Sequence, residues 1–289
     1  MKTSVSFLAS LFCVCLSQIA QAQPVVNAAV NAASNQPLLA PGCWMSIYGT
    51  SLAPETKQAT AVPLPALLSG VSVSVGGLAA PLLFVSPNQI NALIPFEVAG
   101  TGPAGTRSVA VTVTNGQVTS APHYILVNPA APALYTRDMT GAGPAIFLSP
   151  GFQLLDAVAP GDTVIVYAAG LGQTDPPATS NTGGATTEPY NRVIASAMPE
   201  VYIGDQQATV LFAGLAPGFA GVYQLNLQVP AGVSSIASTC APANCKATSR
   251  KSEFPPDKTP LTSPGPSTAS FPVTALTPFT PRASRSICR

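Results

Sequence analysis

Three blocks of sequence occur twice in this chain, in the same order. PGCWMSIYGTSL (41–52) matches PGDTVIVYAAGL (160–171), VSVGGLAAPLLFVS (73–86) matches VYIGDQQATVLFAG (201–214), and QINALIP (89–95) matches QLNLQVP (224–230). Identical residues keep identical spacing within each block, as Tyr48 does with Tyr167 and Phe84 with Phe212. Chance is a poor explanation for three ordered matches. We therefore predict two copies of one domain.

Each block has the pattern of a β-strand. The first turns at Pro-Gly and then alternates, the second ends in a Gly-centred hairpin turn, and the third alternates until Pro95 or Pro230 stops it. The first copy continues with VAVTV, the hairpin signal Asn115-Gly116 and YILV. Short strands with regularly spaced turns, without strand–helix alternation, predict an all-β chain of two tandem immunoglobulin-like β-sandwiches.

The same residues carry a family resemblance. SIYGTSL, QINALIP and VAVTVTNG resemble the TIG/IPT type of immunoglobulin-like domain. The paired blocks IYGTSLA, FVSPNQINALIPFEV, VYAAGLG and FAGLAPGFAGVYQLNLQVP closely resemble an uncharacterised two-repeat module found at the C-termini of secreted proteins of soil bacteria. The resemblance runs from about Leu39 to Val233. It implies a fold and an extracellular setting, and it brings no established activity or site residues.

The N-terminus has the pattern of an export signal. Lys2 precedes the apolar stretch FLASLFCVCL, and Ala20-Gln21-Ala22 is a small-x-small cleavage site before Gln23. The apolar stretch is shorter than the ~20 residues of a transmembrane helix. We expect a mature protein without a transmembrane segment, secreted to the extracellular space or periplasm. The predicted division is a signal peptide (1–22), an N-terminal extension (23–38), two domains (39–136 and 137–233) and a tail (234–289).

The tail departs from the pattern of the first copy. Where residues 107–127 supply two alternating strands, the second copy changes after Val233 to a Pro/Ser/Thr-rich basic sequence, so its last strands are expected to be missing. Residues 237–289 hold seven of the chain's 12 Lys and Arg. A stalk, a disulfide-stapled appendage and a frameshift product are the three explanations. We hypothesise the frameshift, because the loss occurs in the middle of a domain; reading the DNA after codon 233 in the other frames tests it.

The cysteines indicate disulfide candidates in the tail. Cys13 and Cys15 leave with the signal peptide, and Cys43, Cys240, Cys245 and Cys288 remain for an oxidising compartment. The disulfide candidates are Cys240, Cys245 and Cys288, whose pairing the sequence does not choose. The Cys240-x4-Cys245 spacing is not that of a zinc site. Cys43 stands where the second copy has Asp162, and we expect a free thiol there if the position is exposed.

Groups that carry chemistry are sparse, so no enzymatic activity, metal or cofactor is predicted. His123 is the only histidine, no Gly-x-Ser-x-Gly elbow occurs, and the carboxylates are scattered. Asp156, Asp162 and Asp175 are the one set considered for Ca²⁺, but they lack Asp-x-Asp-x-Asp spacing, so turn and cap roles are favoured. The basic tail lacks ordered aromatic residues for base stacking, and nucleic-acid binding is not expected.

One loop stands out as a candidate for binding. From Phe212 to Gln224 the second copy takes 12 steps, whereas the first takes five from Phe84 to Gln89, and the excess centres on Pro217-Gly218-Phe219.

Phe219 and Tyr223 are accordingly the candidate ligand-binding residues. A core role is nevertheless favoured over a sugar-stacking platform with Trp44 for the tyrosines Tyr48, Tyr167, Tyr202 and Tyr223, whereas Phe219 is left open between the two roles. We expect a non-enzymatic adhesion or spacer module at the bacterial surface, whose partner is a surface protein or a polysaccharide. The alternative is a carbohydrate-binding accessory domain. The oligomeric state is left open.

Overall fold

The computed structural model describes residues 22–99, 105–204, 206–233, 236–237 and 245–248. These residues belong to one compact unit, Met1–Lys251. The predicted signal peptide, Cys240, Cys288 and most of the predicted tail lie outside the described residues. In the part of the chain that is described, the fold is all-β with two short 3₁₀ helices, η1 (Phe96–Ala99) and η2 (Ala195–Ala197), as the sequence predicts. Neither is long enough or apolar enough to cross a membrane.

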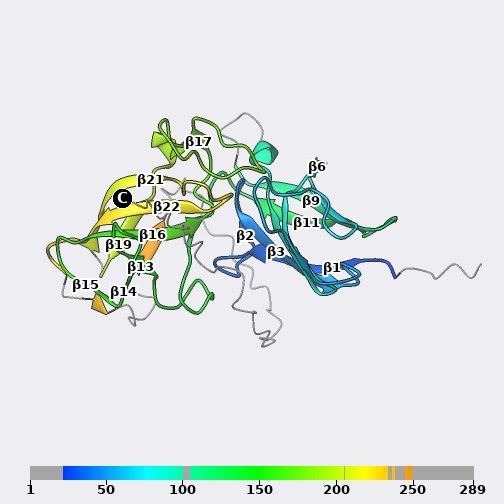
Figure 1. Ribbon diagram of the computed structural model, residues 1–289, viewed down its shortest axis with the longest axis horizontal. Helices are drawn as coiled ribbons and strands as arrows, with labels where there is room; N and C mark the ends of the chain where they lie inside the picture. The colour runs from blue at the N-terminus through cyan, green and yellow to red at the C-terminus, as the bar shows by residue number, and fades with distance from the viewer. Residues whose placement is uncertain (1–21, 100–104, 205, 234–235, 238–244, 249–289) are drawn as a thin grey trace, which may run out of the picture. The chain divides into compact units, whose positions relative to one another are not determined.

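The first half of the chain, β1 to β11, forms two sheets (Figure 1). In order across one sheet lie β1 (Val25–Asn31), β3 (Trp44–Thr50), β8 (Gln89–Leu93), β7 (Leu82–Val85) and β4 (Lys57–Gln58). Across the other lie β2 (Leu38–Leu39), β11 (His123–Val127), β9 (Arg107–Asn115), β5 (Val71–Val75) and β6 (Leu78–Ala79), with β10 (Val118–Thr119) paired to β9. One buried cluster takes side chains from both sheets, among them Ile47, Ile90, Val73 and Val111, so the two sheets form a β-sandwich.

The second half, β12 to β24, is built around one large sheet. In order across it lie β14 (Leu154–Leu155), β13 (Phe147–Leu148), β16 (Thr163–Ala169), β22 (Tyr223–Gln228), β21 (Thr209–Leu215), β18 (Arg192–Val193) and β17 (Thr174–Asp175), with β12 (Ala133–Leu134) paired to β16. Two smaller sheets are β15 (Ala157–Val158) with β23 (Ile236–Ala237), and β20 (Gln206–Gln207), β19 (Glu200–Ile203) and β24 (Cys245–Thr248). Figure 1 shows β16, β22 and β21 side by side.

The matching sequence blocks lie on strands that pair in the same way. The order β3–β8–β7 in the first half corresponds to β16–β22–β21 in the second. Tyr48 is opposite Gln89 in one, and Tyr167 is opposite Gln224 in the other. The β7–β8 pairing and the β21–β22 pairing also each have a register shift immediately before the shared phenylalanine, between Leu82 and Phe84 and between Val210 and Phe212. The two blocks therefore share their register and also their irregularity.

Individual hydrogen bonds repeat as well. The Gln89 side-chain amide donates to Asn91 Oδ1 at 2.9 Å, and the Gln224 amide donates to Asn226 Oδ1 at 2.8 Å. These bonds hold the two polar side chains of the Gln-x-Asn sequence together on one face of the strand, since residues two apart point the same way. The shared Gln and Asn thus have a local structural role in both halves.

The end of the second half differs from the prediction in one respect. We expected its closing strands to be missing, but β24 pairs with β19 where β9 pairs with β5 in the first half. β24 has four residues and β9 has nine. β15, which corresponds to β2, pairs with the two-residue strand β23 in an antiparallel direction, whereas β2 pairs with β11 in a parallel one. The frameshift hypothesis stays a hypothesis.

Candidate functional site

The enlarged loop lies between β21 and β22, and the structure separates its two candidate residues. Phe219 is at the tip and is 42% exposed, whereas Tyr223 begins β22 and is 0% exposed. Tyr223 thus lies in the core, the role favoured for the tyrosines, and is not placed to contact a ligand at the surface. Tyr223 follows the same inward alternation as Leu225 and Leu227, which are also fully buried.

Tyr223 has a core role with a satisfied hydroxyl. Its O–H donates to the carbonyl oxygen of Gly172, so burial leaves no polar atom of the side chain without a partner. Burial in an apolar environment raises the pKa of the Tyr223 phenol above its ordinary value, because the charged form is disfavoured there. The ring packs in the cluster that fills the second half.

Phe219 is held in place by its surroundings. Its ring lies 6.4 Å from the Tyr167 ring, centroid to centroid, at an interplanar angle of 43°. Its carbonyl oxygen accepts from Gly184 N at 3.1 Å, and the neighbouring Gly218 N donates back to Gly184 O at 2.8 Å. The tip is therefore hydrogen-bonded to the loop that joins β17 and β18. Of the two predicted ligand-binding residues, Phe219 alone presents part of its ring to solvent.

The tip residues after Phe219 contact the first half. Trp44 Nε1 donates to Ala220 O at 2.9 Å, across 176 residues of sequence. Trp44, Leu64, Leu93 and Ala220 form a small buried cluster. The backbone comes so close that a Cβ atom on Gly221 would lie 2.1 Å from Leu93 Cδ1. The enlarged loop is thus a docking element between the two halves.

A second set of contacts between the halves is polar. Ser180 Oγ accepts from Phe96 N at 2.8 Å and donates to the Glu97 carboxylate. Leu64 N donates to Asn181 O at 2.9 Å. Phe96 itself belongs to the buried cluster of the second half. Side chains and backbone groups from both halves therefore complete one junction.

The other aromatic residues weighed as a sugar-binding platform, Trp44, Tyr48, Tyr167 and Tyr202, are not arranged as one. Trp44 is 7% exposed and lies under the docked loop. Tyr48, Tyr167 and Tyr202 are half-buried, in line with the core role expected for them.

Cys43 is a free thiol, but it is buried rather than exposed. Desolvation raises the pKa of this thiol to about 12, so it stays protonated and unreactive near neutral pH. The predicted disulfide cysteines are not tested: Cys240 and Cys288 lie outside the described residues, and only the backbone of Cys245 is described, in β24.

The carboxylates considered for Ca²⁺ have separate partners. Asp162 Oδ2 accepts from Ala159 N at 2.7 Å and so closes its own turn, and Asp156 pairs with Arg137 at 3.2 Å. Asp175 is on β17, and His123 is half-buried at the start of β11. Within the described ranges, His, Cys, Asp and Glu side chains do not gather in a group that would hold a metal.

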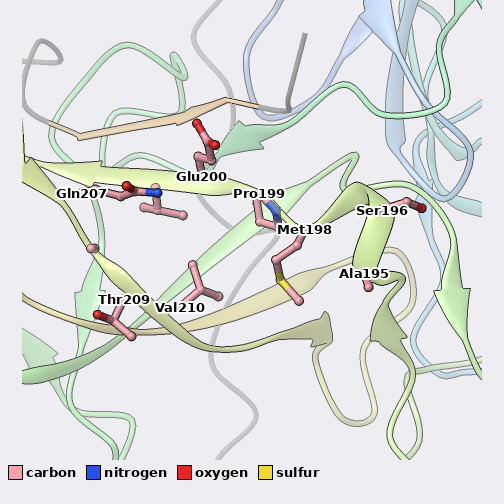
Figure 2. A pocket seen from close by; sticks show the side chains of 10 residues that line it. Ala195, Ser196, Met198, Pro199, Glu200, Gln207, Thr209 and Val210 are labelled. Atoms are coloured by element: carbon pink, nitrogen blue, oxygen red, sulfur yellow. The ribbon is translucent and has the colours of Figure 1, made fainter. Parts of the chain in front are cut away.

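A hollow of about 520 Å³ lies between the 195–199 segment and the starts of β19 and β21. In Figure 2 the side chains of Met198 and Val210 lie on one side of β19 and the Glu200 carboxylate lies on the other. Glu200 Oε2 accepts from the Tyr202 hydroxyl at 3.4 Å. A binding pocket needs polar groups that converge on the ligand. The hollow is lined by apolar side chains, Met198 and Val210, and by polar ones, Ser196, Gln207 and Thr209, and none of the candidate residues predicted from the sequence lines it.

Two features of the sequence are a partial signal for the junction. The chain has one tryptophan, placed in a duplicated block where the second copy has a threonine, Thr163. The loop excess is likewise confined to one copy. Each departure from the duplication contributes one side of the Trp44–Ala220 contact.

Comparison with models of known protein families gives no match to this chain, and comparison with curated proteins finds no significantly similar sequence.

Proposed function

We propose that this protein is an exported, non-enzymatic adhesion and spacer module, made of two tandem immunoglobulin-like domains of the TIG/IPT type. The duplication supports the tandem arrangement, because matched blocks have matched strand pairs and hydrogen bonds. The N-terminal signal pattern supports export. Asp162, Asp156 and Tyr223, which were considered for chemistry or binding, are engaged in turn closure, an ion pair and the core.

The contact between Trp44 and Ala220 carries the spacer role. A spacer holds its two ends at a set distance from each other, which requires that its domains do not hinge freely. Domains joined by one linker move by default unless their interface is extensive and apolar. Here an indole, a docked loop and the Ser180 bonds join the halves in addition to the linker.

Unfolding of the full-length chain tests this proposal. Trp44 is the only tryptophan, so its fluorescence reports the junction directly, while far-UV circular dichroism reports the strands of both halves. We expect the two signals to change together in one urea transition, because the junction joins the halves into one cooperative unit. Two transitions, with the tryptophan signal changing before most of the strand signal, contradict a fixed spacer.

Export is tested in the same preparation. We expect protein recovered from the periplasm or medium of a bacterial host to begin at Gln23, as N-terminal sequencing would show. Intact protein retained in the cytoplasm contradicts the exported setting. Phe152→Ala is the control variant for the unfolding test of the spacer role. Phe152 is an exposed aromatic residue outside the junction, so its removal should leave the single transition in place.

A further inference from the structure

The outward face of one sheet in the first half has an unusual composition. Side chains on a strand alternate between two faces, and Val109, Val111 and Val113 of β9 point into the core. The residues between them, with their neighbours on β5 and β11, point outward. None of these outward side chains is charged. The eight are Ser72 and Ser74 on β5, Ser108, Ala110, Thr112 and Thr114 on β9, and Tyr124 and Leu126 on β11. β2, β11, β9 and β5 follow one another across this sheet (Figure 1).

One end of the face is apolar. Tyr124 on β11 is 66% exposed, and Leu126, two residues on, is 50% exposed. Leu38 on β2 is opposite Leu126 in the parallel pairing and is 51% exposed. These three side chains form a continuous apolar strip beside the strand β9.

The other end of the face is an array of hydroxyl groups. Ser72 is opposite Thr114, and Ser74 is opposite Thr112, in the pairing of β5 with β9. Thr114 Oγ1 and Thr119 Oγ1 are 2.9 Å apart, which extends the row onto β10. Neighbouring strands are about 4.8 Å apart, so hydroxyl groups recur across the sheet at that spacing. This distance is close to the length of one sugar unit in an extended chain.

We propose that this face binds a neutral β-linked polysaccharide, with Tyr124 against the apolar face of a sugar ring and the serine and threonine hydroxyls against the sugar hydroxyls. An aromatic ring combines a large apolar contact with little loss of conformational freedom. The absence of charge from the eight outward side chains means that a neutral polymer desolvates no ion on this face. An anionic or cationic polymer gains no ion pair in exchange for its own desolvation.

The size of the face argues against a second copy of the chain as its occupant. A stable protein–protein interface uses about 20–30 residues on each side. The eight outward side chains on β5, β9 and β11, together with Leu38 on β2, are far fewer. A small face is sufficient for a weak contact with a few consecutive sugar units of a polymer.

This inference deepens the proposed adhesive role and rests on it for the exported setting. It places adhesion on the β5–β9–β11 face rather than on the enlarged loop. Phe219 therefore supplies a matched control, since it is an exposed aromatic residue on a different surface.

The test is binding of the full-length chain to microcrystalline cellulose, with Tyr124→Ala, Thr112→Lys and Phe219→Ala. We expect the wild type and Phe219→Ala to bind equally. Tyr124→Ala and Thr112→Lys should each weaken binding at least tenfold, through loss of the ring contact and through a charge in the hydroxyl array. Raising the salt to about 1 M should change binding little, because no ion pair is screened. Unchanged Trp44 emission shows that each variant is folded.

Three binding results overturn the inference. They are no binding of the wild type to cellulose, equal binding of all four proteins, and loss of binding in Phe219→Ala alone. Sedimentation tests the other occupant, a second copy of the chain. A dimer that Tyr124→Ala dissociates identifies the face as a self-association surface and overturns the inference. A failure to bind cellulose leaves the single unfolding transition expected of the spacer unaffected, so the two proposals fail separately.

Discussion

The indole N–H of Trp44 donates to the carbonyl oxygen of Ala220 at 2.9 Å, from the start of β3 to the tip of the enlarged loop. Both residues are buried, with 7% and 6% of their surfaces exposed. A buried carbonyl without a donor costs free energy, because it has given up its hydrogen bonds to water. This bond therefore makes the docking of the loop specific as well as favourable.

Trp44→Phe is expected to lower the free energy of unfolding by about 1–3 kcal/mol, because Ala220 O loses its donor while the apolar contact is largely kept. Calorimetry or far-UV circular dichroism in urea would measure it, since the variant has no tryptophan. Tyr124→Phe is the control, because the Tyr124 ring is 66% exposed, and it should change stability by less than about 0.5 kcal/mol. Equal effects of the two substitutions would mean that the junction bond contributes nothing.

Gly221→Ala is expected to destabilise the chain more than Gly218→Ala. Both glycines have positive φ, +63° and +80°, so alanine is strained at either position. At Gly221 the new Cβ would also lie 2.1 Å from Leu93 Cδ1, whereas at Gly218 it meets nothing within 4 Å. The difference between the variants thus isolates the contact with the first half. We expect at least about 1 kcal/mol in urea unfolding, and a shift of Trp44 emission to longer wavelength for Gly221→Ala only.

The duplicated blocks allowed the strands to be predicted, and the reason is local. Alternation along VSVSV and VAVTV, and turns at Gly76-Gly77 and Asn115-Gly116, depend on a few neighbouring residues, and β5, β6, β9 and β10 follow them. The same alternation would have placed Tyr223 in the core, since it is in phase with Leu225 and Leu227. This position agrees with the core role favoured for the tyrosines, and the candidacy of Tyr223 for binding came only from counting it as part of the loop.

The junction is a different case. At the start of β3 the consecutive residues Cys43, Trp44 and Met45 are all buried. Alternation explains one face of the strand, and the docked loop covers the other. No local pattern states which distant loop covers a strand, because that depends on how two folded halves meet. The sequence therefore showed the two anomalies, a lone tryptophan and a longer loop, without showing that they touch.

Tyr223→Ala and Phe219→Ala are expected to differ sharply, although the two rings are only four residues apart in the sequence. Removing the fully buried Tyr223 ring should cost about 3–5 kcal/mol, because the core is left with a cavity and Gly172 O loses its donor. Phe219 is 42% exposed, and its loss should cost about 1 kcal/mol or less. Urea midpoints of the two full-length variants would show it. A Tyr223→Ala midpoint close to that of the wild type is incompatible with the core position.

Alkaline pH is expected to destabilise the chain through Cys43. Burial raises the pKa of this thiol from 9.0 to about 12 in the folded state. Below about pH 9 the thiol is protonated in both the folded and unfolded states, so it adds no pH dependence. Between about pH 9 and 12 the unfolded chain loses this proton while the folded chain keeps it. The free energy of unfolding should therefore fall as pH rises, by up to about 1.4 kcal/mol per pH unit from this group.

Cys43→Ala isolates that contribution. Burial also raises the pKa values of Tyr135 and Tyr223, and their effect is present in both proteins. The variant should lose a roughly constant amount of stability below about pH 9 and show a shallower decline above it. Urea unfolding followed by Trp44 fluorescence at a series of pH values gives both slopes. Parallel slopes for the wild type and Cys43→Ala would mean that the thiol is accessible to solvent, contrary to its place in the buried cluster of the first half.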